Sequence, residues 1–416
     1  MEHRNRFKHP GQLDPSLGLV VADVGWFNTE NLFREIDDDA VALLLLKCQD
    51  HVNGHRRGVY PWSRACRTHP LGPRVWERQH VLPSGWMKRY PRLGMRPIAR
   101  SVRRWLAELP ALEHQALVMT YPHYLELKNQ LGPDVAVYYN IDDYALYWPR
   151  EAERTAELER RAVRESDLTI CVSRLRSLEL KAAVPEATGR IHHIPHGAPS
   201  HFLADRPLAA PVEPPDDLIG FPRPLLGYVG SLEGRVDWAL MDELAVRFPA
   251  ASVVVIGRQG AVGAEPWWAD CERFLKRPNV HLIGWRSQEQ LPRYFQAFDV
   301  NLIPYRMDHP FNRACCPTKI MDAMAASRPI VATAIPECLL HRERFDVVDS
   351  TADFVAAIER ILESGSDDGR SAVRLDYAAD HTCKQVARRI LDLIQAVRGF
   401  RHAPEGRTAA SHALAP

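Results

Sequence analysis

The second half of the chain alternates short apolar runs with stretches of helical periodicity, and this alternation limits the possible folds more than any other feature. The apolar runs cover residues 225–229, 252–256, 280–283, 300–303 and 330–331. They are nearly continuous and rich in β-branched side chains, which is typical of strands buried on both faces of a sheet. Helical spacing follows at 238–247 and 287–297. The pattern predicts βαβ units and a parallel, doubly wound α/β sheet.

The first half is predicted to form a second parallel sheet with larger insertions. Its candidate strands are residues 17–24, 41–46, 116–120, 135–139 and 168–172, and its candidate helices are 96–108 and 150–165. Proline is dense over 206–224, and such a segment resists both helix and sheet. We therefore expect a first domain over 1–205, a linker over 206–224, a second domain over 225–375 and a disordered tail over 401–416.

Composition excludes several classes of protein. The formal net charge of the 416 residues is +1, so the chain as a whole is not a polyelectrolyte binder. It contains no apolar run of the roughly 18 to 20 residues that span a bilayer, and its charged N-terminus has no secretory core. The eight cysteines form no CxxC pair, so free thiols are expected and structural zinc is not. A cytoplasmic protein is predicted.

Two strand ends in the second half could bind a phosphorylated ligand, because helix N-termini meet ligands at the carboxyl ends of parallel strands. The first contains Gly230 and Ser231 after a buried strand. In the second, Thr318 is placed to cap a helix whose first turn carries Lys319, which suits a diphosphate. Asp322 follows one turn later and suits ribose hydroxyls. A plain strand-to-helix turn and a solvated amphipathic helix remain the alternatives.

Several motifs in the order found here resemble the donor-binding domain of GT-B glycosyltransferases, specifically family 4 and its relatives in polysaccharide synthesis. They are Gly-Tyr-Val-Gly-Ser at 227–231, Val-Val-Ile-Gly-Arg at 254–258, and the segments 279–284, 298–304 and 317–333. The first half agrees more loosely, at 138–144, 167–173 and 194–197. The resemblance covers roughly 116–397. It implies two Rossmann-like doubly wound domains facing across a cleft, with a helix over 376–400 crossing back to the first domain.

The resemblance also implies roles for individual residues. The nucleotide of a UDP- or GDP-linked sugar would lie on the second domain, as a substrate, with no cofactor and no metal. The implied donor contacts are Gly230, Ser231, Arg258, Trp285, Arg286, His309, Asn312, Thr318, Lys319 and Asp322. The sequence departs from the family at several positions: Ala314 and Asp322 stand where many members have glutamates, Ser231 replaces an arginine, Asp237 falls near a lysine position and Ser327 replaces a glycine. Arg235 or Lys319 could supply the missing charge.

The acceptor would enter from the first domain, and an inverting reaction would need a base there. The candidates are His123, which follows a predicted strand, and the pair Asp142 and Asp143. A structural histidine, and a turn or N-cap role for the aspartates, are the alternatives.

A basic stretch interleaved with tryptophan and tyrosine precedes these residues. Its cations include Lys88, Arg89, Arg92, Arg100, Arg103 and Arg104. Such a composition suits an anionic membrane surface on the inner face of the cell membrane, or a lipid-linked acceptor. A solvated helix face is the alternative, and no nucleic-acid recognition motif accompanies the charge.

The sequence thus predicts a glycosyltransferase that moves a sugar from a nucleotide-sugar to a saccharide or lipid-linked acceptor in surface polysaccharide or glycolipid synthesis. Two other functions remain open. One is a degenerate, non-catalytic sugar-binding protein, which the departures at Ala314 and Ser231 would explain. The other is an epimerase or phosphorylase on the same fold, although no lysine setting for pyridoxal phosphate is evident.

Overall fold

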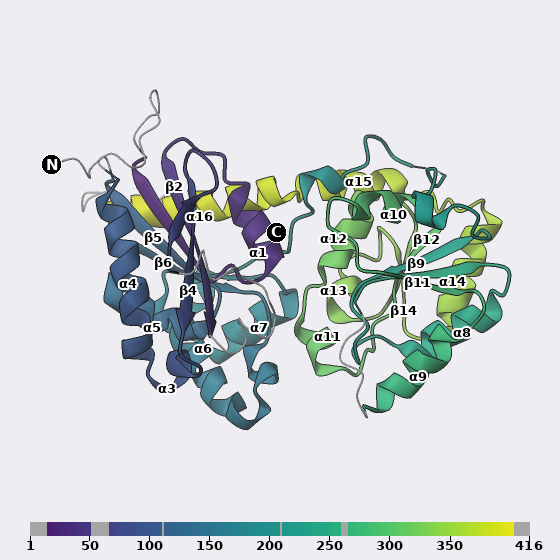
Figure 1. The fold of residues 1–416 in the computed structure, drawn as a ribbon, viewed down its shortest axis with the longest axis horizontal. Helices are drawn as coiled ribbons and strands as arrows, with labels where there is room; N and C mark the ends of the chain where they lie inside the picture. The colour runs from purple at the N-terminus through teal and green to yellow at the C-terminus, as the bar shows by residue number, and fades with distance from the viewer. Residues whose placement is uncertain (1–14, 51–65, 110–111, 209, 259–264, 403–416) are drawn as a thin grey trace.

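The computed structural model describes residues 15–50, 66–109, 112–208, 210–258 and 265–402. Its chain forms two α/β lobes, the first purple to blue and the second green in Figure 1. Part of the tail expected at 401–416 lies outside the described residues.

The first lobe is built on an eight-stranded sheet with the order β3-β4-β2-β1-β5-β6-β7-β8. Its strands are β1 (Leu17–Ala22), β2 (Val41–Asp50), β3 (Thr68–Pro70), β4 (Val75–Leu82), β5 (His114–Met119), β6 (Val135–Asn140), β7 (Leu168–Cys171) and β8 (Ile191–His193). All neighbours are parallel except β3, which pairs antiparallel with β4. The central strands are fully buried, as their apolar sequences predict.

The second lobe has a six-stranded parallel sheet with the order β11-β10-β9-β12-β13-β14. Its strands are β9 (Leu225–Val229), β10 (Ser252–Ile256), β11 (Val280–Gly284), β12 (Val300–Ile303), β13 (Ile330–Thr333) and β14 (Asp346–Val348). The strand order reverses between β9 and β12, so a crevice opens beyond their carboxyl ends.

Helices cover the faces of both sheets. In the first lobe they are α1 (Phe27–Arg34), α3 (Trp86–Arg89), α4 (Pro91–Ala107), α5 (Leu125–Leu131), α6 (Ala152–Glu165) and α7 (Arg174–Ala183). In the second they are α8 (Trp238–Arg247), α9 (Pro266–Leu275), α10 (Leu291–Ala297), α11 (Pro310–Ala314), α12 (Thr318–Ala325), α13 (Pro336–Leu339), α14 (Thr351–Glu363) and α15 (Ser371–Asp380). Among the described residues, no helix is both long and apolar enough to cross a membrane. All eight cysteines are free thiols.

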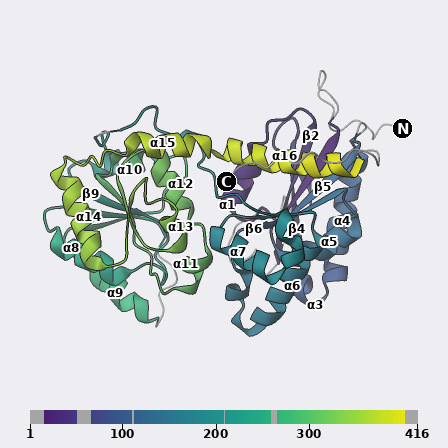
Figure 2. The ribbon, with the colours of Figure 1, turned by 180° about the vertical axis from the view of Figure 1, so that it is seen from behind.

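The last helix, α16 (Cys383–His402), runs from the second lobe back along the first, as the yellow ribbon of Figure 2 shows. It packs against α1 and β6, and Val386, Ile390 and Ile394 join the core of the first lobe. Where the chain returns, the amide of Cys383 donates to the carbonyl of Ala198 at 2.8 Å. A side chain at Gly197 would place its Cβ 2.6 Å from the Cys383 nitrogen, so this close crossing requires glycine. Both chain crossings between the lobes therefore lie side by side.

Candidate functional site

Two cavities lie between the lobes and meet at a common wall. The first, of about 740 Å³, is lined mainly by the first lobe, and the second, of about 1090 Å³, mainly by the second lobe. Both are lined by Trp26, Ser231, Arg235 and Lys319. These four residues mark the place where groups bound in the two cavities would come together.

Two glycine turns form the floor of the second cavity. Gly230 follows β9 and its amide donates to the carbonyl of Ile256 at 2.7 Å. Gly257 follows β10, and a Cβ there would lie 1.9 Å from the carbonyl oxygen of Gly230. The two strand ends are therefore packed backbone to backbone, which leaves space above them for a ligand.

Lys319 and Arg235 bring positive charge to the wall shared by the two cavities. Lys319, in the first turn of α12, donates from Nζ to the Tyr305 hydroxyl at 2.8 Å. Arg235 donates to the same hydroxyl from Nη2 at 3.0 Å. Ser231 stands where the family resemblance leads us to expect an arginine. The structure brings Arg235 into the same cavity as Ser231. Two cations at the N-terminus of a helix form a site suited to a diphosphate.

Asp322 lies one turn further along α12 and lines the second cavity. Burial raises the pKa of its carboxyl group to about 7, against the opposing charge of Lys319. Thr318 also lines this cavity, but the prediction that it caps the helix is wrong. Thr318 is the first helical residue; the preceding Pro317 occupies the cap position, and no side chain accepts a hydrogen bond there.

Three further donor candidates line the second cavity, but they differ in the partners that they contact. Arg258 and Trp285 line the second cavity as a pair, with the guanidinium 4.9 Å from the indole centroid. Arg286 lines it too, but its donors bind Asp217 at 2.6 Å in the linker and Tyr294 at 3.0 Å.

His309 and Asn312 line neither of the two cavities. Asn312 is fully buried and its amide donates to the carbonyls of Arg235 and Arg306, both at 2.8 Å. Asn312 therefore holds the backbone of Arg235 in place, which a motif comparison could not reveal.

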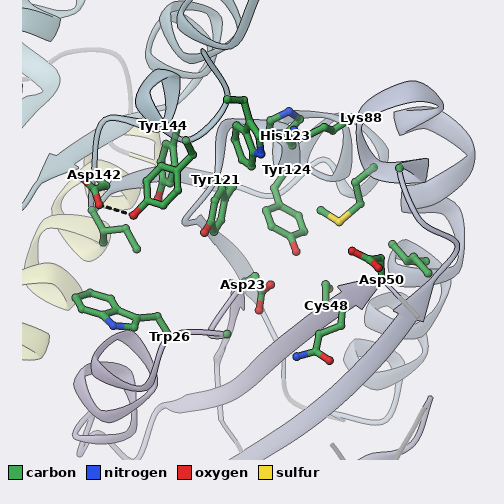
Figure 3. Close-up of a pocket in the computed structure, with 18 of the residues that line it drawn as sticks. Asp23, Trp26, Cys48, Asp50, Lys88, Tyr121, His123, Tyr124, Asp142 and Tyr144 are labelled. Carbon is green, nitrogen blue, oxygen red and sulfur yellow. Dashed lines mark hydrogen bonds between the residues drawn. The ribbon is translucent and has the colours of Figure 1, made fainter. Parts of the chain in front are cut away.

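Aromatic side chains dominate the first cavity, and Figure 3 shows them around an open centre. They are Trp26, Tyr121, Tyr124, Tyr144, Tyr147 and Trp148 of the first lobe, with Tyr228 of the second. His123 lies among them, with its ring edge-on to Trp148 at 5.6 Å. Burial, aided by the charge of Lys88, lowers the pKa of His123 to about 4, so this imidazole is neutral at pH 7.

Of the two adjacent aspartates, only Asp142 lines the first cavity. It accepts a hydrogen bond from the Tyr147 hydroxyl at 2.6 Å, and burial raises its pKa. The Asp143 carboxylate accepts from the amide of Ala145 at 3.1 Å and lies 3.8 Å from Arg176. Asp143 thus has the N-cap role that the sequence left open for it.

The basic stretch divides into two parts that point in different directions. Lys88 lines the first cavity, 3.5 Å from the Trp148 ring centroid and 3.4 Å from Glu151. The arginines at 89, 92, 100, 103 and 104 are exposed on α3 and α4. Trp86, Tyr90 and Leu93 are also exposed there, with fractional exposures of 38%, 56% and 46%.

Sequence reasoning missed Asp23, Trp26 and Cys48, which line the first cavity after β1 and on β2. The strand prediction for 17–24 contained the signal for Asp23, since this residue stands at the carboxyl end of a buried parallel strand. The sequence does not give the order of the strands in the sheet, so it could not show that Asp23 and His123 lie at the same edge.

Three comparisons with known proteins agree with this architecture. Residues 223–364 match the model of a family described as glycosyl transferases group 1. A protein of Bacillus subtilis (strain 168), provisionally named teichuronic acid biosynthesis glycosyltransferase TuaH, is 22% identical over 293 residues, which cover 67% of this chain and 71% of that protein.

Solved structures share the whole fold at low sequence identity. Sucrose-phosphate synthase from Thermosynechococcus elongatus has a TM-score of 0.69 at 14% identity, covering 93% of this chain and 100% of that one. HepE of Anabaena, solved in complex with UDP and glucose, has a TM-score of 0.63 at 13% identity, covering 91% of this chain and 99% of that one. The predicted GT-B fold of two parallel-sheet domains is confirmed, as is the resemblance to GT-B glycosyltransferases.

Proposed function

We propose that this chain, a glycosyltransferase of the GT-B fold, binds a nucleotide-sugar in the second cavity and transfers the sugar to a saccharide or lipid-linked acceptor in the first. The observation that carries the proposal is the shared wall of the two cavities, where Ser231, Arg235 and Lys319 meet Trp26 of the other lobe. A donor whose diphosphate lies on this wall would present its sugar to the acceptor cavity.

The residues of the second cavity suit each part of a nucleotide. The backbone amides after Gly230 and the side chains of Lys319 and Arg235 would bind the diphosphate. Asp322 would accept hydrogen bonds from ribose hydroxyls, and the Trp285 ring would stack on the base. HepE, which shares the fold, is recorded with UDP and with UDP-glucose, which supports a UDP-linked donor.

The first cavity suits a sugar acceptor. Aromatic rings give flat apolar surfaces, and His123 and Asp142 supply hydrogen-bonding groups between them. The TuaH relative is named for teichuronic acid biosynthesis, which supports an acceptor in surface polysaccharide synthesis. The presence of Arg235 beside Ser231 also favours catalysis over a degenerate binding protein, because the missing cation has a replacement.

Calorimetric titration tests the donor site directly. We expect one of UDP, GDP, ADP and dTDP to bind selectively to the purified protein, and its sugar conjugates to be slowly hydrolysed. Failure of all four nucleotides to bind would contradict the proposal and leave the non-catalytic function in its place.

Replacing Asp322 with alanine should weaken nucleotide binding about 10- to 100-fold at pH 8, where a carboxyl group with a pKa of about 7 is ionised, because the ribose hydroxyls lose a charged acceptor worth about 1.5–3 kcal/mol. Titration of the same nucleotide into Asp322→Ala and parent protein measures the change. Asp270→Ala is the matched control, since Asp270 is exposed on α9 and pairs with Arg273 at 2.8 Å. An unchanged affinity in Asp322→Ala would exclude the ribose role.

The exposed surface of α3 and α4 is proposed to contact an anionic membrane. These helices expose Arg89, Arg92, Arg96, Arg100 and Arg103, and they also expose Trp86, Tyr90 and Leu93. Arginines attract anionic headgroups, and the aromatic rings suit the membrane interface. Such a contact would place a cytoplasmic enzyme beside a lipid-linked acceptor on the inner face of the membrane.

Co-sedimentation with vesicles of phosphatidylglycerol and phosphatidylcholine tests this surface. Arg96→Gln, Arg100→Gln and Arg103→Gln together should reduce vesicle binding by roughly two orders of magnitude at low salt, at about 1 kcal/mol for each charge. Arg160→Gln, Arg161→Gln and Arg164→Gln, on α6, form the control set. Parent protein that stays in the supernatant would remove the membrane proposal before any variant is made.

A further inference from the structure

A third cavity lies on the first lobe beside the first cavity, and no role has been assigned to it. Its volume is about 550 Å³, and it is lined by residues of α3, α5 and α6 together with the segments next to them. Met87, Lys88 and His123 line both cavities. Figure 3 shows Lys88 and His123 next to each other at the edge of the first cavity. A molecule bound in the first cavity could therefore extend directly into the third.

The first cavity lies between the second cavity and the third. None of the described residues that line the third also lines the second, whereas the first shares residues with both. Glu126, which lines the third cavity, also lines a smaller groove of about 350 Å³ beside Arg92, Arg96, Arg100 and Arg103 of α4. These arginines belong to the surface proposed above to contact a membrane. The cavities and this groove thus form one path from the donor wall to that surface.

Lys88 connects the first and third cavities through its contacts. Its Nζ lies 3.5 Å from the centroid of the Trp148 ring, which lines the first cavity, and 3.4 Å from a carboxylate oxygen of Glu151, which lines the third. The paired side chains of Lys88 and Glu151 are 29% and 45% exposed, and such an exposed ion pair contributes little to stability. The hydroxyls of a ligand that crosses this boundary would bind Lys88 and Glu151 in place of their exposed pair.

The lining of the third cavity is polar and close to electrical balance. Its carboxylates are Glu126, Glu151, Glu153 and Glu157, its cations are Lys88, Arg154 and Arg161, and Leu125, Leu158 and Pro91 add apolar surface. An acyl chain would cover these charged groups without pairing them, which is costly. An anionic group would lie among the carboxylates. Sugars suit such a lining, because their hydroxyls both donate and accept hydrogen bonds and their C–H faces are apolar.

Several polar side chains of the third cavity are available to a ligand. Asn129 is exposed on α5 and Glu153 is exposed on α6. Neither makes a side-chain hydrogen bond or an ion pair with any residue that the structure describes. The Arg154 guanidinium lies at the long distance of 3.5 Å from the Lys88 carbonyl. These groups could bind sugar hydroxyls without breaking hydrogen bonds on which the fold depends.

We propose that the third cavity binds the saccharide units next to the one that accepts the transferred sugar, so that the acceptor is an oligosaccharide, uncharged over these units, rather than a single sugar. The proposal rests on the function proposed above and defines its acceptor more closely. The accepting sugar would lie among the aromatic rings of the first cavity, and the preceding units would pass His123 and Lys88 into the third. A volume of about 550 Å³ is in the range of small-molecule sites and has room for more than one sugar unit.

Calorimetric titration with glucose, with maltose and maltotriose, and with cellobiose and cellotriose tests the proposal through chain length. We expect at least one trisaccharide to bind the parent protein about tenfold more tightly than glucose, or better, because its added units contact the third cavity. Asn129→Trp fills that cavity from α5, so it should lower the affinity for the trisaccharide to that for glucose and leave glucose binding unchanged. Trigalacturonic acid, which has the same length but is charged, should bind the parent less tightly than the best trisaccharide.

Lys276→Trp is the control, since this side chain is 72% exposed on α9 and lines none of the cavities described above. Glu153→Ala, which removes a hydrogen-bonding group instead of filling the cavity, should also reduce the effect of chain length. Equal affinities for one, two and three units in both series, or an effect of length that both Asn129→Trp and Glu153→Ala leave intact, would overturn the proposal. Tighter binding of trigalacturonic acid would overturn the uncharged acceptor.

Nucleotide titration of the same samples separates this proposal from the function on which it rests. Parent protein that binds none of UDP, GDP, ADP and dTDP would overturn the function itself. Protein that binds a nucleotide but shows no effect of saccharide length would overturn only the third cavity as an acceptor site. Nucleotide affinity in Asn129→Trp should equal that of the parent, because the third cavity shares no described lining residue with the donor cavity.

Discussion

Replacing Lys319 with alanine should reduce kcat for transfer by about 100- to 1000-fold, the largest effect that we expect from a single side chain on the second lobe. The reason is electrostatic: negative charge develops on the leaving diphosphate, and a fixed cation there is worth roughly 3–4 kcal/mol in the transition state. The Tyr305 hydroxyl, 2.8 Å from Nζ, holds this cation in place before the substrate arrives. Nucleotide release measured at saturating donor gives kcat.

The comparison variants separate charge from packing. Lys319→Arg keeps the charge and should lose less activity than Lys319→Ala. Lys276→Ala, on the exposed end of α9, should act like the parent, because its side chain is 72% exposed and pairs only with Glu272 among the described residues. If Lys319→Ala turns over at the parent rate, the diphosphate does not bind at this wall.

Replacing Arg374 with methionine should lower the free energy of unfolding by about 3 kcal/mol, because the buried carboxylate of Asp368 loses its two-point partner and keeps only Arg370, at 3.2 Å. Arg374 is fully buried and donates to both oxygens of Asp368, at 2.6 and 2.8 Å. It also donates to the carbonyl of Ser327 at 3.0 Å. Urea titration followed by tryptophan fluorescence measures the loss.

The pH dependence of this loss has a definite sign. Burial opposes ionisation of Asp368, but Arg374 and Arg370 more than compensate and hold its pKa below the usual value. The pair therefore stabilises the fold above the pKa of an unfolded aspartate, and that contribution is lost as the pH falls into the acid range. The destabilisation in Arg374→Met should accordingly shrink at low pH.

Arg360→Met is the control for Arg374→Met. Arg360 pairs with Asp346 at 2.6 Å but is 61% exposed, so its loss should cost less than about 1 kcal/mol. Arg374→Met combined with Asp368→Leu should recover part of the stability, since no unpaired charge remains buried. Equal losses in Arg374→Met and Arg360→Met would show that burial of the pair is unimportant.

The second lobe could be predicted closely because its strands are short, apolar and bounded by turns. The residues at 225–229, 252–256 and 300–303 form β9, β10 and β12 as expected. The turn after α12 could also be interpreted: Ser327, at the usual glycine position, adopts a φ of 66°. Its hydroxyl accepts from the amide of Leu208 at 2.9 Å, a contact with the linker that no local pattern encodes.

The first lobe was harder to predict because its cavity is assembled from distant strands. Asp23, Cys48 and His123 follow or belong to β1, β2 and β5, and only the sheet order brings them to one edge. The basic stretch shows the opposite difficulty. Its residues are adjacent in sequence, yet Lys88 lines the cavity while Arg100 lies on the exposed surface, because the orientation of each side chain depends on helix packing.

The adjacent chain crossings at Ala198 and Cys383 act as a hinge, because any rotation of one lobe against the other must pivot close to them. Displacement under such a rotation grows with distance from the pivot. Pro199, His201 and Cys383 line the second cavity, so this cavity lies beside the hinge. None of the three residues lines the first cavity. A donor nucleotide could therefore bind with little change at its own site. The width of the first cavity, which lies farther from the pivot, would change more with each rotation of the lobes than that of the second.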